Sequence, residues 1–342
     1  MRCLLFVLLA LTIVSNAFSG TFPKDKLPPY ITPLTDVGQR AEWSHDGATV
    51  MFLTRAGGEV MEIDLQTKET RSITEHIQRP EGWGYYRALY LPNGDFLLTG
   101  GPRRHEAYLQ IMDKSLTKQP KVFDLIIREG PALSRKIFKI AYTKVQDKIW
   151  VADVVYRHGE PFVENDTLII DNKNVTIDGI KYEGMVEPQN FRPPDDKELI
   201  WSQYGNDDRG IFTAETMGYN MENGELVNYS KAPNQYDEPE GIFPSGDYTL
   251  TECDRHHNLG TGYIDVYRLA LDGTGSDYVR LTHFSDAPGF RGTNPVVSDD
   301  GQFIVFQESR SDSPPGAGEG LYLLDLEKMY NLKAELRPAQ KK

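Results

Sequence analysis

The chain has 342 residues, of which 25% are charged, and its formal net charge is −13. Proteins that bind nucleic acid usually carry a basic stripe, so this acidic balance argues against a nucleic-acid partner. The two cysteines, Cys3 and Cys253, allow no internal disulfide once a leader that contains Cys3 has been removed.

The first 19 residues are typical of a signal peptide. Arg2 supplies a positive charge, residues 4–14 form an apolar run, and the small residues that follow allow cleavage after Ala17 or Ser19. An uncleaved membrane anchor is the alternative, but it would need about 20 apolar residues. We therefore expect an exported protein with no later membrane span, either secreted or, in a bacterium, periplasmic.

A six-fold repeat follows this leader, and each unit has a short β-type run, a polar turn and a hydrophobic strand. The turns are predicted at residues 45–47, 92–94, 146–148, 195–197, 244–246 and 299–301. Their last residues are separated by 47, 54, 49, 49 and 55 positions. Periods of this size, built from strands, predict a β-propeller.

Each unit supplies four strands. In the first unit, residues 60–65 form a third strand of alternating character and residues 70–74 form a fourth. A four-stranded blade cannot bury both of its faces alone, whereas six blades around an axis bury them against each other. The sequence thus predicts an all-β fold, a six-bladed β-propeller over residues 20–330 with a charged tail at 331–342. The blades are expected at approximately 40–74, 87–126, 135–180, 185–230, 237–282 and 293–327.

The ring is predicted to close through the N-terminal segment 30–35. The last unit lacks a fourth strand after Leu326, and residues 30–35 resemble the fourth strands at 71–74 and 279–282. Pairing of this segment as the outer strand of the sixth blade would leave no open sheet edge. A disordered linker is the alternative, because two prolines precede the segment.

The remaining cysteine, Cys253, lies in the predicted strand 249–253. A single cysteine of this kind typically behaves as a small core residue, so we expect a buried structural thiol. A nucleophilic role would need an activating partner, and His256 and His257 are close in the sequence.

Three triplets match the N-glycosylation pattern, at Asn165, Asn174 and Asn228. All three fall at predicted blade edges or loops. They predict glycosylation only if the source is a eukaryote.

The two faces of the predicted propeller differ in their loops. Turns between first and second strands are minimal and often contain glycine, and they define the short-turn face. The loops between blades and those between second and third strands are longer, and they define the long-loop face. Binding residues concentrate on loops that a rigid scaffold holds. We therefore predict a central depression at the long-loop face, more polar than the opposite end, lined by the candidate ligand-binding residues Trp83, Arg87, Arg135, Gln189, Glu238, Glu240, Arg255, His256, Arg291 and Asn294.

Several candidates also have a purely structural interpretation. The pair Asp254-Arg255 fits an ion pair between blades, and the aromatic residues of these loops fit packing between blades. His256 and His257 are metal-ligand candidates if a loop directs both at one ion, although no fixed ligand spacing is present. The nearby oxygen ligands would be Glu238, Glu240 or Gln189. No cofactor is predicted beyond such a divalent metal.

The repeat sequences resemble a known family. Residues 43–47 and 297–306 resemble TolB-like, or WD-like, β-propeller repeats, and residues 190–195 and 236–256 resemble a group of exported members. The resemblance covers nearly the whole mature chain and implies the propeller fold, but propellers carry many unrelated activities. TolB works in periplasmic protein complexes, and its amino-terminal domain is absent here. Oligogalacturonate lyases are similar propellers with a histidine-rich manganese site, which only the His256-His257 neighbourhood resembles.

Three functional hypotheses follow. The leading one is a secreted, monomeric propeller that binds a protein or carbohydrate ligand on its long-loop face. The second is a metal-assisted lyase or hydrolase of an acidic carbohydrate, in which Arg255 or Arg291 neutralises a substrate carboxylate and a histidine acts as base. It requires His256 or His257 within hydrogen-bond reach of Glu238, Glu240 or Gln189. The third is a structural or assembly role.

Overall fold

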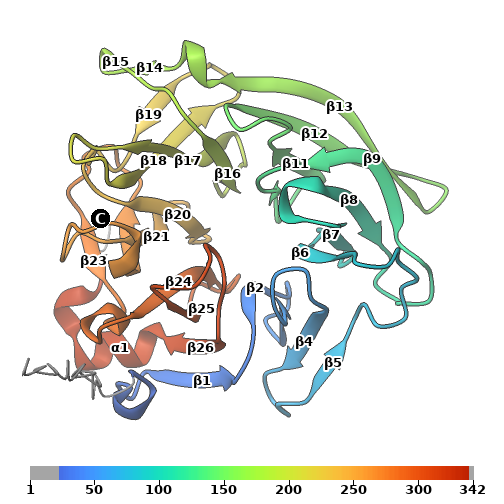
Figure 1. Ribbon diagram of the computed structural model, residues 1–342, viewed down its shortest axis with the longest axis horizontal. Coiled ribbons are helices and arrows are strands. Elements are labelled where there is room, and N and C mark those ends of the chain that lie inside the picture. The colour runs from blue at the N-terminus through green and yellow to red at the C-terminus, as the bar shows by residue number, and fades with distance from the viewer. Residues whose placement is uncertain (1–22, 339–342) are drawn as a thin grey trace, which may run out of the picture.

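Six four-stranded antiparallel sheets stand around a common axis in the computed structural model, which describes residues 23–338 (Figure 1). First strands of neighbouring blades contact one another, so they line the axis, while fourth strands lie at the outside (Figure 1). The fold is therefore the predicted six-bladed β-propeller. The predicted signal peptide and the last four residues of the tail lie outside the described residues.

We name the blades A to F in chain order. Blade A contains β2 (Gln39–Trp43), β3 (Thr49–Leu53), β4 (Val60–Asp64) and β5 (Thr70–Ser72). Blade B contains β6 (Gly84–Tyr90), β7 (Phe96–Gly101), β8 (Ala107–Met112) and β9 (Lys121–Ile127). Blade C contains β10 (Ala132–Leu133), β11 (Lys139–Tyr142), β12 (Lys148–Arg157) and β13 (Glu160–Asp171).

The second half of the ring repeats this pattern. Blade D contains β16 (Val186–Phe191), β17 (Glu198–Asn206), β18 (Phe212–Asn220) and β19 (Leu226–Asn228). Blade E contains β20 (Asp237–Ile242), β21 (Tyr248–Cys253), β22 (Asp265–Ala270) and β23 (Tyr278–Arg280). Blade F contains β24 (Phe290–Val297), β25 (Phe303–Arg310), β26 (Gly320–Asp325) and, from the start of the chain, β1 (Ile31–Thr35).

The remaining elements are short. A hairpin of β14 (Thr176–Ile177) and β15 (Ile180–Lys181) lies at the outside between blades C and D, and α1 (Leu326–Leu332) follows blade F (Figure 1). The 3-10 helices are η1 (Pro23–Lys26), η2 (Arg104–Glu106), η3 (Asn172–Asn174), η4 (Thr261–Tyr263), η5 (Phe284–Asp286) and η6 (Ala334–Leu336). Within residues 23–338, none of the helices combines the length and the apolar character needed to cross a membrane.

The N-terminal strand closes the ring as predicted. Strand β1 pairs antiparallel with β26, with Ile31 opposite Leu324. The backbone N–H of Asp325 donates to the carbonyl of Tyr30 at 2.8 Å, which extends this pairing. Blade F is therefore built from both ends of the chain, and its outer position is occupied.

The core is divided among the seams between blades. Each of the six pairs of neighbouring blades has its own cluster of buried apolar side chains. Met51 and Leu98 meet between blades A and B, for example, and Phe52 and Val305 meet between blades A and F. This arrangement explains why one blade alone is not a stable unit.

A repeated hydrogen bond ties third strands to fourth strands. A backbone N–H of the third strand donates to a hydroxyl of the fourth-strand segment at 3.0, 3.0 and 2.9 Å in the pairs Val60–Thr74, Thr216–Ser230 and Val266–Thr282. In blades A and E the same hydroxyl donates to the preceding acid, Glu59 or Asp265. Asp265 is therefore a structural acid of the repeat.

The register predicted for the third blade is wrong. Residues 146–148 connect β11 to β12, the second and third strands, whereas the turn between first and second strands is at 134–138. The error has a physical cause. Strand β10 has only two residues and its turn lacks glycine, while β12 and β13 are the longest strands of the blade and dominate the pattern.

One of the three glycosylation triplets is not available in the folded chain. Asn165 and Asn174 are exposed, but Asn228 is buried. Its Nδ2 donates to Glu215 at 2.7 Å and to the Tyr182 hydroxyl at 3.0 Å. A glycan on that nitrogen would break both hydrogen bonds and has no room. The prediction of a glycosylation site at Asn228 is therefore wrong.

Candidate functional site

The axis of the propeller is hollow at both ends. The long-loop chamber has a volume of about 330 Å³ and is lined by second-to-third-strand loops and by side chains of the inner strands. The short-turn chamber has about 390 Å³ and reaches the opposite face. Arg40 and Glu240 line both. The predicted depression at the long-loop face is present, but charged residues also line the other end, so the predicted contrast in polarity is not found.

Arg135 spans the mouth of the short-turn chamber. It lies in the 134–138 turn of blade C, and its guanidinium pairs with Glu42 of blade A and, at 2.5 Å, with Asp299 of blade F. Blades C and F are opposite in the ring, so the side chain crosses the axis. The prediction that Arg135 faces the long-loop chamber is therefore wrong, and the misplaced turn of blade C is the reason.

Three glutamates converge on the wall of the long-loop chamber. Glu238 and Glu240 both lie on β20, where a register shift between Pro239 and Gly241 makes Glu240 the extra residue of a β-bulge. The β20–β21 register places Glu252 directly opposite Glu238. One oxygen from each carboxylate lies within 4.8 Å of the other two. Like charges directly opposite each other in a sheet are destabilising, so other interactions must offset the repulsion within this trio.

Burial and mutual repulsion change the protonation of this trio. Burial is the largest cause, and the neighbouring carboxylates add to it, so the pKa of Glu238, Glu240 and Glu252 rises to about 8 in each case. Near neutral pH the trio therefore retains protons instead of holding three full negative charges.

Hydrogen bonds hold the carboxylates in place. Glu238 accepts from the hydroxyls of Tyr204 and Tyr236. Asn294 of β24 holds the other two: its Nδ2 donates to Glu240 Oε1 and its backbone N–H to Glu252 Oε1, both at 2.8 Å. Asn294 thus links blade F to the acidic strands of blade E.

Arginines balance the other acids of the chamber. Arg104 pairs with Glu129 at 2.7 Å, and Arg87, which lines the short-turn chamber, lies 3.7 Å from Glu187. Arg291 donates to the backbone carbonyls of Thr261 and Arg310. The chamber lining therefore carries both acidic and basic side chains, and the trio is its largest group of neighbouring acids.

An aromatic side chain lies at the mouth. Phe212 is 40% exposed and stacks on Tyr204 with ring centroids 5.4 Å apart and planes 10° apart. His105 is exposed on the same lining and lies 3.5 Å from Glu129. The rim thus offers a flat apolar surface beside polar groups.

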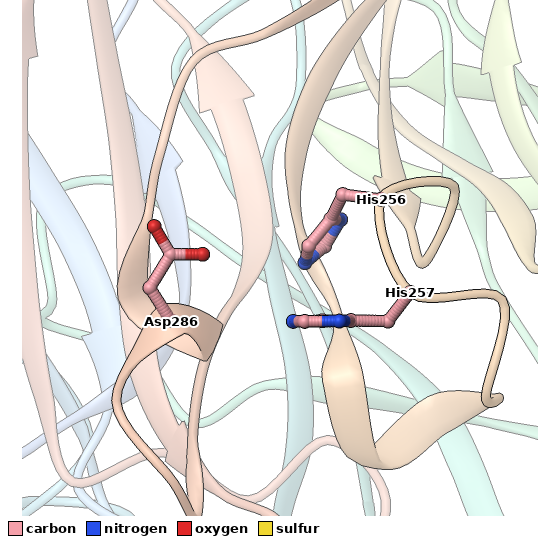
Figure 2. Close-up of side chains that lie close together, drawn as sticks. All are labelled: His256, His257 and Asp286. Carbon is pink, nitrogen blue, oxygen red and sulfur yellow. The ribbon is translucent and has the colours of Figure 1, made fainter.

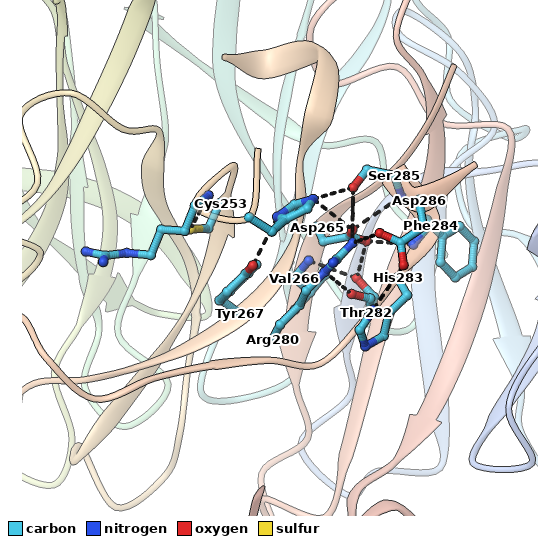
Figure 3. Close-up of polar contacts among 12 residues, drawn as sticks. Cys253, Asp265, Val266, Tyr267, Arg280, Thr282, His283, Phe284, Ser285 and Asp286 are labelled. Atoms are coloured by element: carbon cyan, nitrogen blue, oxygen red, sulfur yellow. Dashed lines mark hydrogen bonds and ion pairs between the residues drawn. The ribbon is translucent and has the colours of Figure 1, made fainter. Parts of the chain in front are cut away.

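His256 lies in a different network, beside Ser285, Asp265 and Tyr267, which Figure 3 shows. Its Nε2 is 2.6 Å from the Ser285 hydroxyl, which donates to Asp265, and its Nδ1 is 3.0 Å from the Tyr267 hydroxyl. Burial and the charge of Arg280 lower the pKa of His256 to about 4, so the ring is neutral. Both ring nitrogens have partners, and the ring is not part of the chamber lining.

His256, His257 and Asp286 lie near one another (Figure 2), with one ligand atom of each within 4.8 Å of the others. Asp286, however, pairs with Arg280 at 2.6 Å and with His283 at 3.3 Å. A metal ion bound here would have to displace Arg280 from the Asp286 carboxylate. The group therefore fits a hydrogen-bonded structural cluster better than a metal centre.

Arg255 also lies away from the chamber. Its guanidinium is 3.5 Å from the ring centroid of Tyr278, 3.6 Å from the Asp237 carboxylate and 3.4 Å from the Ser230 carbonyl of blade D. The prediction that it faces the channel is wrong: its ion pair with Asp237 lies within blade E, and only its hydrogen bond to Ser230 reaches the neighbouring blade. Its acidic partner is Asp237, because Asp254 accepts backbone N–H groups from Tyr236 and Gly260.

The other candidates divide into two groups. Glu238, Arg291 and Asn294 line the long-loop chamber as predicted, whereas Arg87 and Gln189 line the short-turn chamber, so the prediction is wrong for these two. Trp83 instead stacks on Tyr108, with centroids 5.4 Å apart. Cys253 is fully buried, as predicted for a structural thiol.

Sequence reasoning missed several lining residues, chiefly Arg40, Glu129, Tyr204, Phe212 and Glu252. A signal existed for one of them. Glu252 is an acid inside an otherwise apolar and threonine-rich strand, and a charge in such a place is rarely buried without a partner.

Comparisons with known proteins support the fold alone. No sequence-family profile matches the chain, and no curated protein matches it. Among solved structures, TolB from Acinetobacter baumannii is similar over 82% of this chain and 64% of its own, with 12% identity and a TM-score of 0.52. This chain thus spans less than two thirds of that TolB chain.

Two further structures are similar at the same level. A chain of the mitotic checkpoint complex aligns over 95% of this chain and 99% of its own, with 11% identity and a TM-score of 0.51. The β-propeller domain of Cps50 (Swd1) from Myceliophteria thermophila aligns over 86% and 99%, with 10% identity and a TM-score of 0.52. The varied roles of these neighbours leave the function to be argued from the chamber itself.

Proposed function

We propose that the protein binds a carbohydrate in the long-loop chamber. The observation that carries the proposal is the combination of a cavity of about 330 Å³, charged groups of both signs on its wall, and the exposed Phe212 ring at its mouth. Ligand pockets have volumes of roughly 300–1,000 Å³, so this one suits a small ligand. Sugar hydroxyls both donate and accept hydrogen bonds, and the apolar face of a sugar ring packs on an aromatic ring.

The main alternatives are less well supported by this geometry. A protein ligand would use the broader rim instead of a narrow chamber. The lyase or hydrolase hypothesis required His256 or His257 beside Glu238, Glu240 or Gln189, whereas the His256 ring is engaged by Ser285 and Tyr267.

Saturation-transfer difference NMR with a panel of neutral and acidic mono- and disaccharides tests the proposal on the full chain. We expect at least one saccharide to bind, and Phe212→Ala to weaken it about ten-fold. Tyr263→Ala is the matched control, because Tyr263 is also on this face and is 41% exposed but does not line the chamber. If no saccharide binds, or if both variants lose binding equally, the carbohydrate proposal is wrong.

We also propose that the chain is an exported, monomeric member of the TolB-like propellers. The supporting observations are the leader-like residues 1–19, the repeat sequences and a fold shared with TolB. Cell fractionation with N-terminal sequencing should find a mature protein cleaved after Ala17 or Ser19. Light scattering should give the mass of one chain.

A further inference from the structure

The acidic trio has the spacing of ligands around one hard cation. Its three carboxylate oxygens lie within 4.8 Å of one another. Ca²⁺ binds oxygen at 2.3–2.6 Å, so two of its ligands are at most roughly 5 Å apart. The carboxylates therefore already lie at distances that a shared Ca²⁺ imposes.

A second, independent feature is the side-chain oxygen of Asn294. The residue is 5% exposed, and among residues 23–338 its Oδ1 has no hydrogen-bond partner. When Glu240 is ionised the amide has this orientation, because Nδ2 donates to Glu240 and a flip would bring two acceptors together. Since Oδ1 belongs to the same planar amide, it also lies beside that carboxylate. A buried acceptor without a partner destabilises a fold unless a bound group satisfies it.

No lysine or arginine among the described residues forms an ion pair with the trio. Among the described residues, no lysine or arginine nitrogen lies within 4.0 Å of a carboxylate of the trio. Arg87 and Arg104 pair with Glu187 and Glu129 instead. The groups that act electrostatically on the trio from the packed strands are Arg40, Arg87, Arg104, Arg291, Glu187, Tyr204 and Tyr236.

We propose that Glu238, Glu240, Glu252 and Asn294 bind one Ca²⁺ ion at the wall of the long-loop chamber. Carboxylate and amide oxygens are the ligands that Ca²⁺ takes, and its flexible coordination suits a set built from two blades better than the strict octahedron of Mg²⁺. With six to eight positions to fill, the ion has room for hydroxyl oxygens of a ligand. That last role rests on the proposed function, whereas the ion site itself does not.

Protons compete with the ion at this site. Metal binding requires the deprotonated form of the carboxyls, so the binding experiment is set at an alkaline pH.

Isothermal titration calorimetry of the chelator-treated full chain with CaCl₂ at pH 8, without saccharide, tests the site. We expect a single site in the wild type and at least a ten-fold loss of affinity in Glu252→Gln. The control is Glu62→Gln, since Glu62 is a buried glutamate (5% exposed) that pairs with Arg71 at 2.5 Å in blade A. Its affinity should equal that of the wild type.

Terbium luminescence provides a second measurement that does not depend on the variants. Tb³⁺ takes the same ligands as Ca²⁺, and excitation through Tyr204 and Tyr236, which both contact Glu238, should sensitise it until CaCl₂ displaces it. No calcium binding by the wild type, or equal binding by Glu252→Gln, would overturn the inference. Saccharide binding without calcium binding would refute only the ion site, and the reverse result only the carbohydrate proposal.

Discussion

At the residue scale, Asp237 is a buried carboxyl that burial and its cationic partner affect in opposite directions. It is fully buried at the start of β20, and its nearest cationic partner is Arg255 at 3.6 Å. Burial raises the pKa of this carboxyl to about 7, against the opposing effect of Arg255. A carboxyl whose pKa is higher in the folded state binds more protons folded than unfolded. Its contribution to stability is therefore complete below about pH 4 and is lost as the pH rises through 7.

The substitution Asp237→Asn removes this titration and keeps the shape of the side chain. We expect its free energy of unfolding, relative to the wild type, to be higher at pH 8 than at pH 5 by at least about 1 kcal/mol, the equivalent of one pKa unit. Urea unfolding at both pH values measures this difference. A constant offset at the two pH values would show that Asp237 is ionised throughout.

At the element scale, the closing strand β1 carries a prediction of its own. Ile31 is buried in the cluster that joins blades E and F, whereas its neighbour Thr32 is exposed on the same strand. Truncation of a buried isoleucine to alanine costs about 2–5 kcal/mol. Ile31→Ala should therefore lower the thermal midpoint and promote aggregation through the edge of β26, and Thr32→Ala should change neither. Equal midpoints for the two variants would contradict the closure.

Prediction from sequence succeeded where the repeat is regular. Turns with glycine or paired acids, such as those at 45–47 and 299–301, marked five of the six first-to-second connections correctly, because glycine adopts the positive φ of such turns and aspartate side chains bond their backbone. Blade C failed because β10 is two residues long and nothing in its turn is distinctive. Arg135 was misplaced for the same reason.

The candidate site was only partly predictable. Glu238, Glu240 and Asn294 were identified from their position in the segments that lead into the first strands. Glu252 was not, because its role depends on the β20–β21 register, which pairs it with Glu238. Arg255 and His256 were assigned to the chamber because they lie in a loop between second and third strands, but their side chains are held by Asp237 and Ser285.

At the scale of the whole molecule, Arg135 joins blades that are distant in the sequence. It pairs with Glu42 and Asp299 across the axis, and burial raises the pKa of Glu42. Removing one partner of a buried pair costs about 3–5 kcal/mol because the other charge is left uncompensated. Since this pair is partly exposed, we expect about 3 kcal/mol for Arg135→Ala, measured by chemical denaturation. Lys136→Ala, next to it and exposed, should be near neutral, and a similar loss in both variants would refute the account of Arg135.

The most direct test of the central claim, that the long-loop chamber is the functional centre, is an anomalous-difference map from crystals grown with CaCl₂ at pH 8. The account predicts a calcium peak bounded by Glu238, Glu240, Glu252 and the Asn294 side-chain oxygen. A chamber without a peak, its carboxylates paired with arginine, or a peak only at His256, His257 and Asp286, would contradict it.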